Sequence, residues 1–358
     1  QRAPWARLRD KPAIIEHLQA LQAVMEALAE LLTHAAERSK GLQACFLRLQ
    51  EQQARLQRLH QPPADSVQWF ETFTRGFAIT TTPLDIAVPF KKCMDELPCS
   101  WVITSATLAV GQSFAHFNQR MGLSEATTVQ LDSPFDYWNN ALLYLPAGLP
   151  EPQAAGFIPA LVDAALPVIN ACGGRTFMLF TSYRALNQAA ELLQNQLEYP
   201  LLIQGQSSPR DMIEKFRSLG NAVLLGTASF WEGVDVRGEA LSCVIIDKLP
   251  FAAPNDPVME ARLESIRQRG GNPFNDYQIP QAVIALKQGV GRLIRDQHDR
   301  GVLMLCDNRL RTRSYGKIFL DSLPRMPRTQ KLEIVQRFFA DNISTPTFHR
   351  DSDELVSP

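Results

Sequence analysis

The feature that most constrains the fold of this chain is an alternation between short apolar runs and longer amphipathic stretches. The apolar runs, each followed by a polar or glycine-rich turn, are WVIT from 101, FMLF from 177, LLI from 201, AVLLG from 222, CVIID from 243 and VLMLCD from 302. Stretches with helical spacing between most of them are IPALVDAALPVINA from 158, YRALNQAAELLQNQ from 183, PRDMIEKFRS from 209 and DPVMEARLESIRQR from 256. Because parallel strands need long crossovers, this alternation predicts an α/β fold, a parallel sheet covered by helices.

An N-terminal region of different character precedes this alternation. Between residues 12 and 60, apolar residues recur at intervals of three and four, and Pro and Gly are almost absent. This spacing predicts two long helices with a break near Ser39-Lys40-Gly41. The segment HQPPADS from 60 ends the region, and nothing in it indicates chemistry beyond helix packing.

Composition excludes several classes of protein. Apolar residues make up 45% and charged residues 20% of 358 residues, as in ordinary globular proteins, and the net charge of −1 gives no bulk attraction for nucleic acid. The six cysteines form no CxxC pair, so we expect reduced thiols and no zinc or iron–sulfur site in this chain. No apolar run approaches the length of a membrane span and no signal peptide opens the sequence, which favours a cytoplasmic protein.

Polar residues follow the predicted strands at the points where ligands bind in parallel sheets. They are Ser105 and Thr107 after WVIT, Thr181, Ser182 and Tyr183 after FMLF, TASFWEGVD from 227 after AVLLG, and Asp307, Asn308 and Arg309 after VLMLC. Each of these alone is as readily explained as a helix cap. Together they predict hydroxyls, carboxylates and arginine along one edge of one sheet.

The segment QGVGRLIRD, residues 288–296, combines an apolar and a cationic pattern. On a helix, Gln288, Arg292 and Arg295 would share one face, opposite Val283, Leu286, Val290 and Leu293. Gly289 and Gly291 would each cost such a helix roughly 1 kcal/mol, which indicates a close backbone approach. A solvated polar face is the alternative.

The usual phosphate loop is absent from the chain. No GxxxxGK[ST] occurs, and the Gly316-Lys317 pair is followed by Ile. Asp247 ends an apolar run as the first carboxylate of a Walker B pair would, but Lys248 follows it. We therefore predict that the arginine face reaches a phosphate held by another lobe, since arginine pairs bidentately with phosphate oxygens.

These motifs resemble those of the DinG/XPD-like superfamily 2 DNA helicases. TSATL from 104, FTSY from 180, GTASFWEGVDVRG from 226, QGVGRLIRD from 288 and DRGVLMLCDNRL from 299 resemble helicase motifs III to VI in order and spacing, over about residues 76–325. The pattern CDNRL…YG..FL.SLP near the end is most similar to the YoaA branch of the family. The resemblance implies a bacterial ATP-dependent 5′→3′ DNA helicase of repair and replication, associated with the nucleoid.

The resemblance also implies a domain plan. Members of the family have two RecA-like lobes, an Arch insertion and a 4Fe–4S domain. This chain would hold an Arch-like helical segment (1–75), the end of lobe 1 (76–110), a RecA-like lobe 2 (111–325) and a C-terminal helix and tail (326–358). WVIT would lack its native sheet, and the chain alone would be inactive.

Site roles follow from the same motifs. Arg292 and Arg295, with Gln288, would contact the γ-phosphate of ATP, which with its Mg²⁺ would be shared with the missing lobe 1. Residues that would couple the nucleotide to the lobe interface are Glu232, Gly233 and Asp235. Residues that would grip single-stranded DNA or link that grip to ATP are Ser105, Thr107, Ser182, Tyr183, Thr227 and Trp231. The alternative to the coupling role is that Glu232 is a hydrogen-bonded loop carboxylate. The alternative to the DNA contact is that Trp231 is a core side chain.

The C-terminal segment after Pro324 predicts one short helix with Leu332, Val335 and Phe338 or Phe339 on a face. We expect this segment to be a docking element rather than part of the motor. The YoaA resemblance implies contact with the chi subunit of DNA polymerase III through this end, and a frayed terminus is the alternative.

For the function of the whole chain, the alternatives to a helicase are a non-catalytic helicase-like interaction module and an unrelated α/β enzyme.

Overall fold

The computed structural model describes residues 2–97, 99–227, 240–252 and 256–340. The chain divides into two compact units. The smaller one comprises residues 1–101, 118–125 and 252–277, and the larger one comprises residues 102–117, 126–251 and 278–358. In the described part of the chain, no helix has both the length and the apolar character that crossing a membrane requires.

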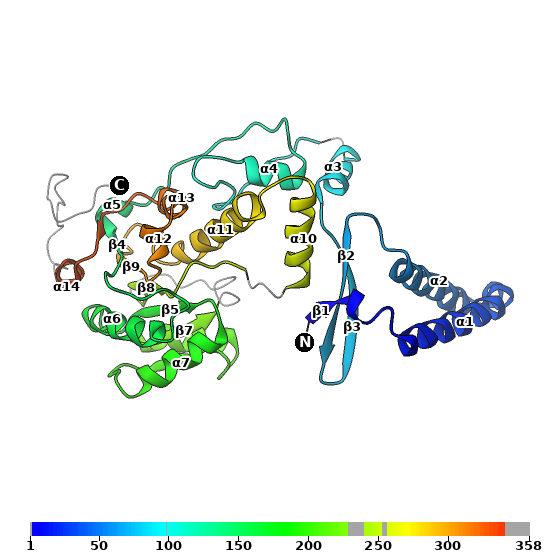
Figure 1. The fold of residues 1–358 in the computed structure, drawn as a ribbon, viewed down its shortest axis with the longest axis horizontal. Helices are drawn as coiled ribbons and strands as arrows, with labels where there is room; N and C mark the ends of the chain where they lie inside the picture. The colour runs from blue at the N-terminus through cyan, green and yellow to red at the C-terminus, as the bar shows by residue number, and fades with distance from the viewer. Residues whose placement is uncertain (1, 98, 228–239, 253–255, 341–358) are drawn as a thin grey trace. The chain divides into compact units, whose positions relative to one another are not determined.

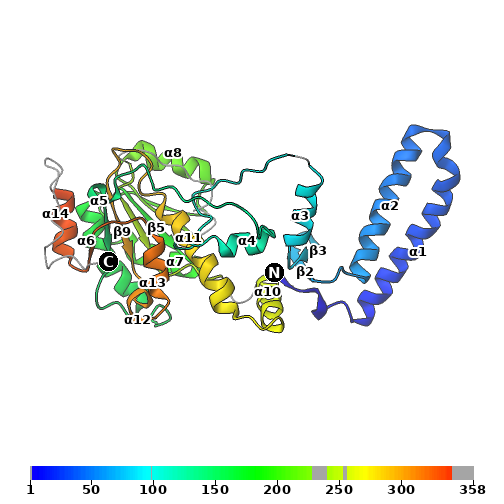
Figure 2. The ribbon, with the colours of Figure 1, turned by 90° about the horizontal axis from the view of Figure 1, so that it is seen from above.

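The smaller unit contains a helical hairpin and an antiparallel sheet of order β1-β2-β3. Its elements are β1 (Arg2–Pro4), α1 (Pro12–Ala35), α2 (Lys40–His60), β2 (Ser66–Phe73), β3 (Gly76–Pro83), α3 (Ala87–Asp95) and α10 (Pro257–Gln268). The predicted helices and their break are confirmed, because Ser39 caps α2 by accepting a hydrogen bond from the Leu42 backbone N–H at 3.2 Å. Figure 2 shows α1 and α2 side by side.

The β2–β3 hairpin was not predicted. Its strands lack a clean apolar–polar alternation, since most of their side chains are half-buried. The available signal was composition, because β2 and β3 are rich in the aromatic and β-branched residues that favour strands. Arg269 follows α10 and bonds both Asp65 and Asp85 at 3.3 Å, which ties the 252–277 segment to the ends of this hairpin.

The larger unit is a seven-stranded parallel sheet of order β10-β4-β9-β8-β5-β7-β6. Its strands are β4 (Ala141–Tyr144), β5 (Thr176–Phe180), β6 (Leu201–Ile203), β7 (Val223–Thr227), β8 (Cys243–Ile246), β9 (Gly301–Leu305) and β10 (Arg328–Thr329). Its helices are α5 (Tyr137–Asn140), α6 (Phe157–Ala171), α7 (Tyr183–Gln194), α8 (Pro209–Leu219), α11 (Ile279–Val290), α12 (Arg309–Thr312), α13 (Gly316–Ser322) and α14 (Leu332–Ala340). The residues of α4 (Ala115–Met121) are divided between the two units.

Helices cover both faces of this sheet, as the alternation predicted (Figure 1). On one face, α8, α11 and α13 contribute Phe216, Leu286 and Phe319 to the core. On the other face, α6, α7 and α14 pack over alternate strand residues. Neighbours such as Leu224 and Leu225 therefore point into different cores, and each central strand is buried on both sides.

The strand predictions succeeded inside the sheet and failed outside it. The runs at 177, 201, 222, 243 and 302 form β5, β6, β7, β8 and β9, whereas WVIT is not a strand. A strand needs a hydrogen-bonding neighbour, and none of the described strands pairs with this run. Its apolar side chains are accordingly exposed, with Val102 at 85%. The strands β4 and β10 were not predicted, and β10 has only two residues.

The C-terminal helix forms as predicted, but the expectation that it stands apart from the motor lobe is wrong. Ile334, Val335 and Phe338 of α14 are buried in the core shared with α6, and the Arg300 guanidinium lies 4.1 Å from the Phe338 ring centroid. β10 also adds a strand beside β4. The apolar face that suggested docking is therefore covered by the sheet itself. Residues 341–358, the rest of the predicted tail, lie outside the described residues.

Truncating Phe338 tests whether α14 belongs to the folded core. Phe338 is 1% exposed, so Phe338→Ala should lower the free energy of unfolding by about 3–5 kcal/mol. The matched control is Gln336→Ala, because Gln336 lies on the exposed side of the same helix. Urea unfolding measures both. Equal stability of the two variants would mean that α14 does not pack on the sheet.

Candidate functional site

The parallel sheet places the predicted site residues at two opposite edges. Ser182 and Tyr183 follow β5, and Thr227 ends β7, so all three lie at the carboxyl ends of strands. Arg292 and Arg295 precede β9 and lie at the amino ends. A strand of five residues, the length of β9, separates the two edges by roughly 16 Å.

The arginine segment is not the helical face that the sequence predicted. α11 ends at Val290, so Gln288 lies in its last turn, and Arg292 and Arg295 lie in the turn that follows. Gly291 is the residue after the last helical position, and its backbone N–H bonds to the Lys287 and Gly289 carbonyls. A Cβ at Gly291 would meet the Lys287 carbonyl oxygen at 3.3 Å, so the close approach at this glycine is to the preceding turn of its own helix.

A buried carboxylate holds this arginine turn. Asp299 Oδ2 accepts hydrogen bonds from the backbone N–H groups of Arg295 and Asp296, each at 2.8 Å. The side chains of Arg292 and Arg295 are half-buried. Burial raises the pKa of the Tyr137 hydroxyl and the positive charge of Arg295 opposes that effect, which puts the guanidinium near α5. The sequence analysis assigned Asp299 no role, although this residue opens the motif DRGVLMLCDNRL.

The TSATL segment is attached to the same helix. Lys287 Nζ donates to the Ala109 carbonyl at 3.1 Å, and burial lowers the pKa of this ammonium. Ala109 lies two residues beyond Thr107, so the structure brings this segment to the residue next to Gln288. Within it, Ser105 Oγ accepts from the Thr107 backbone N–H at 3.2 Å, and Ser105 is exposed.

At the carboxyl edge, one glutamine joins two of the predicted residues. Gln204 follows β6, donates from Nε2 to the Tyr183 hydroxyl at 2.8 Å, and accepts at Oε1 from the Thr227 backbone N–H at 2.6 Å. Ser182 caps α7, with Oγ accepting from the Ala185 backbone N–H at 3.3 Å, as the helix-cap alternative had it. Sequence reasoning missed Gln204, because its partners lie in other parts of the chain.

A buried carboxylate also ends β8. Asp247 Oδ1 accepts from the Thr181 and Lys248 backbone N–H groups at 3.1 and 2.7 Å, and Thr181 Oγ1 lies 3.2 Å from Oδ2. Burial raises the pKa of Asp247 from 3.8 to about 6, against the opposing effect of these hydrogen bonds. The residue therefore ties the ends of β5 and β8 together.

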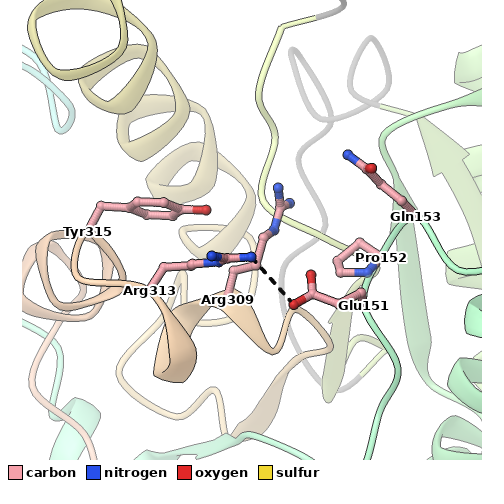
Figure 3. Close-up of a pocket in the computed structure, with 6 residues that line it drawn as sticks. All are labelled: Glu151, Pro152, Gln153, Arg309, Arg313 and Tyr315. Atoms are coloured by element: carbon pink, nitrogen blue, oxygen red, sulfur yellow. Dashed lines mark ion pairs between the residues drawn. The ribbon is translucent and has the colours of Figure 1, made fainter.

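Asp307, which follows β9, is likewise a buried carboxylate that accepts from a neighbouring loop, and it lies next to a surface cavity. It accepts from the Leu249 backbone N–H at 2.8 Å and forms a two-pronged pair with Arg309, whose pKa these bonds raise. The cavity, about 300 Å³, is lined by Glu151, Pro152, Gln153, Arg309, Arg313 and Tyr315 (Figure 3). Arg313 pairs with Glu151 at 3.7 Å, so each arginine in the wall faces a carboxylate.

Several predicted residues fall outside the described part of the chain. These are Trp231, Glu232, Gly233 and Asp235. Among the described residues, no cluster of His, Cys, Asp or Glu side chains could hold a metal ion. Of the six cysteines, Cys172, Cys243 and Cys306 are buried, whereas Cys45, Cys93 and Cys99 are exposed.

Comparison with known proteins identifies one domain of the chain. The model of the helicase C-terminal domain family matches residues 165–326, which include most of the parallel sheet and the arginine turn. The chain contains a helicase C-terminal domain, and its sequence is similar to YoaA and DinG helicases. The fold class predicted from the sequence, a RecA-like parallel sheet with N-terminal helices, is confirmed.

The relatives of the helicase domain are longer proteins. The ATP-dependent DNA helicase YoaA of Escherichia coli K12 is 45% identical over 331 residues, 92% of this chain and 52% of that protein. The YoaA of Haemophilus influenzae is 44% identical over 94% of this chain and 53% of its own length. A solved XPD helicase is similar in fold, with a TM-score of 0.55 at 15% identity over 84% of this chain and 55% of its own. The chain thus spans about half the length of these relatives.

Asp247 gives the helicase domain a pH-dependent stability. A carboxyl whose pKa is raised on folding contributes stability that is complete below its unfolded pKa and is lost as pH rises through its folded pKa. For Asp247 the window runs from about 3.8 to about 6, and two pKa units correspond to on the order of 3 kcal/mol.

Asp247→Asn should abolish the loss of stability that Asp247 causes as pH rises. In this variant the amide oxygen still accepts from the two backbone N–H groups, and the amide nitrogen donates to Thr181 Oγ1. Urea unfolding from pH 4.5 to 7 should show a gain in variant stability relative to wild type as pH rises. A difference that does not change with pH would contradict the shifted pKa.

Proposed function

We propose that this chain is the second motor lobe of an ATP-dependent 5′→3′ DNA helicase that acts in DNA repair and replication. The observation that carries the proposal is the half-buried arginine turn at the amino edge of the sheet, with its backbone fixed by Asp299. Arginines held in this way suit the charge that develops in phosphoryl transfer. In this proposal Arg292 and Arg295, with Gln288, contact the γ-phosphate.

The nucleotide itself is held elsewhere in the proposal. The sequence has no GxxxxGK[ST] loop, so ATP and its Mg²⁺ need the first lobe of the longer protein. Glu232, Gly233 and Asp235 are assigned to the coupling of nucleotide and lobe interface, and a 4Fe–4S cluster to the part of the protein outside this chain. We accordingly infer that the chain alone does not hydrolyse ATP.

The domain plan is part of the proposal. Residues 1–75 would be Arch-like, 76–110 the end of lobe 1, and 111–325 lobe 2. The exposed WVIT run supports the second assignment, because Trp101, Val102 and Ile103 form an apolar run that pairs with no described strand. The burial of α14 extends lobe 2 to at least residue 340.

Single-stranded DNA is the proposed substrate at the carboxyl edge. Ser182, Tyr183 and Thr227 converge there, and Trp231 follows β7 in the sequence. Ser105 and Thr107 would link DNA grip to ATP state, and the Lys287–Ala109 contact supports this by joining their segment to the helix that precedes the arginine turn.

A second candidate, a non-catalytic interaction module, is favoured by one observation. On α1, Leu21, Val24, Leu28 and Leu31 recur at intervals of three and four and are all exposed. This spacing is typical of a seam against another helix. ATPase and unwinding assays of the intact protein separate the two functions, because a module has neither activity.

Arg295→Ala in the full-length protein tests the motor proposal. Loss of this charge should reduce DNA-stimulated ATP turnover by roughly 10³-fold, as for other arginine fingers. Arg210→Ala is the control, since Arg210 is an exposed arginine of the same sheet unit and should leave turnover unchanged. Thermal unfolding confirms that both variants are folded. Near-normal ATPase in folded Arg295→Ala would contradict the assignment.

The proposed protein partner is the chi subunit of DNA polymerase III, at the C-terminal end. Since α14 is already buried, the binding segment would have to lie after it. Truncation after Asn342 in the full-length protein should abolish chi capture in a pull-down and leave DNA-stimulated ATPase intact. Unchanged capture would remove the tail from the interaction.

A further inference from the structure

We propose that Gln204 is a positioning residue that makes the Tyr183 hydroxyl a directed hydrogen-bond donor to a phosphate oxygen of single-stranded DNA. The inference rests on the proposed function, in which Tyr183 lies on the DNA track. It adds a residue, a contacting atom and the chemical group that the atom recognises.

The orientation of the Gln204 amide follows from its partners. A backbone N–H can only donate, so the atom 2.6 Å from the Thr227 nitrogen must be the amide oxygen, Oε1. The other end of the amide, Nε2, therefore faces the Tyr183 hydroxyl at 2.8 Å and can only donate to it. No choice between nitrogen and oxygen is left open at this amide, unlike at most glutamines.

This orientation fixes the hydroxyl protons of both neighbours. Thr227 Oγ1 lies 3.1 Å from the acceptor Oε1 and donates its proton to it. Tyr183 accepts from Nε2, so its own proton points away from Gln204. Thr227 is buried and Tyr183 is 55% exposed, so Tyr183 is the better placed of the two to reach a ligand. Thr227 serves to hold Gln204.

The backbone of Gln204 is fixed as well. Its N–H donates to the Leu225 carbonyl on β7 at 3.0 Å, and the chain then turns away through Gly205 at a φ of 103°. β7 lies between β5 and β6 in the sheet, so the amide bridges the ends of all three strands. Rotating the Gln204 side chain would break its bonds to Thr227 and Tyr183 together.

A donor that is fixed and exposed requires an acceptor on the ligand. The non-bridging oxygens of a phosphodiester are acceptors without protons, whereas base edges mix donors and acceptors. The geometry therefore points to the DNA backbone at this position, and to recognition that is independent of base sequence.

Gln204→Glu in the full-length protein tests the inference. Glutamate keeps the acceptor for Thr227 but cannot donate to Tyr183, so the tyrosine proton turns inward to the carboxylate. Affinity for a 15-nucleotide oligothymidine, measured by fluorescence anisotropy, should fall about 10-fold or more, the usual effect of losing a hydrogen bond to a charged group. Gln206→Glu adds the same charge two residues away on an exposed side chain and should have a smaller effect.

Tyr183→Phe provides the second arm and keeps the fold, because the hydroxyl is at the surface. Its loss of affinity should match that of Gln204→Glu after the charge control is subtracted, and combining the two changes should add no more to the loss of Tyr183→Phe than the charge control does. Oligonucleotides with one neutral methylphosphonate at successive positions should weaken wild-type binding at one position and leave Tyr183→Phe insensitive there.

The outcomes separate the two levels of the proposal. If wild type binds the oligonucleotide and Gln204→Glu binds as Gln206→Glu does, or if the effects of Gln204→Glu and Tyr183→Phe simply add, the Gln204 assignment is overturned while the helicase proposal stands. If wild type does not bind the oligonucleotide, the DNA track itself is overturned, and the role of Gln204 with it.

Discussion

Backbone hydrogen bonding among parallel strands is the constraint on which the rest of the larger unit depends. Every central strand is buried on both faces, so its polar backbone must be paired within the sheet, and the crossover helices must cover both sides. All strand ends of one kind then fall at one edge. This directionality separates the arginine turn before β9 from the hydroxyl and amide groups after β5, β6 and β7.

The two edges are stabilised in similar ways. Asp247 and Asp307 are buried at the carboxyl ends of β8 and β9 and accept from backbone N–H groups of neighbouring loops, while Asp299 does the same in the turn before β9. In each case a carboxylate supplies acceptors that the irregular backbone would otherwise lack. Asp299 thus fixes the backbone at Arg295, and Asp247 fixes Thr181, which precedes Ser182 and Tyr183.

The sequence predicted the part of the fold that is governed by periodicity. Fully buried strands such as β5 and β9 are unbroken apolar runs, and amphipathic helices such as α7 have a clear spacing, so both were found. WVIT has the composition of a core strand but does not form a strand, because strand formation depends on a neighbouring strand that local sequence does not specify. The turn at Gly291 was read as helix because the apolar spacing continues beyond Val290, to Leu293.

The candidate site was predictable in its types of residue but not in its connections. Ser182, Tyr183 and Thr227 could be placed at one edge because each follows an apolar run. Gln204 could not be linked to them, since its partners Tyr183 and Thr227 lie 21 and 23 positions away along the chain. The sequence analysis compared Asp247 with the first carboxylate of a Walker B pair. In the structure its hydrogen bonds to Thr181 and Lys248 give it a structural role.

The central claim is that this lobe completes an ATPase site whose phosphate loop lies in another segment. The most direct measurement is ATP hydrolysis by this chain mixed with the separately produced segment that precedes the matching region in the longer relatives, with single-stranded DNA present. The account predicts that neither piece alone turns over ATP and that the mixture does. A mixture that forms a complex without hydrolysing ATP, or full activity of the preceding segment alone, would contradict it.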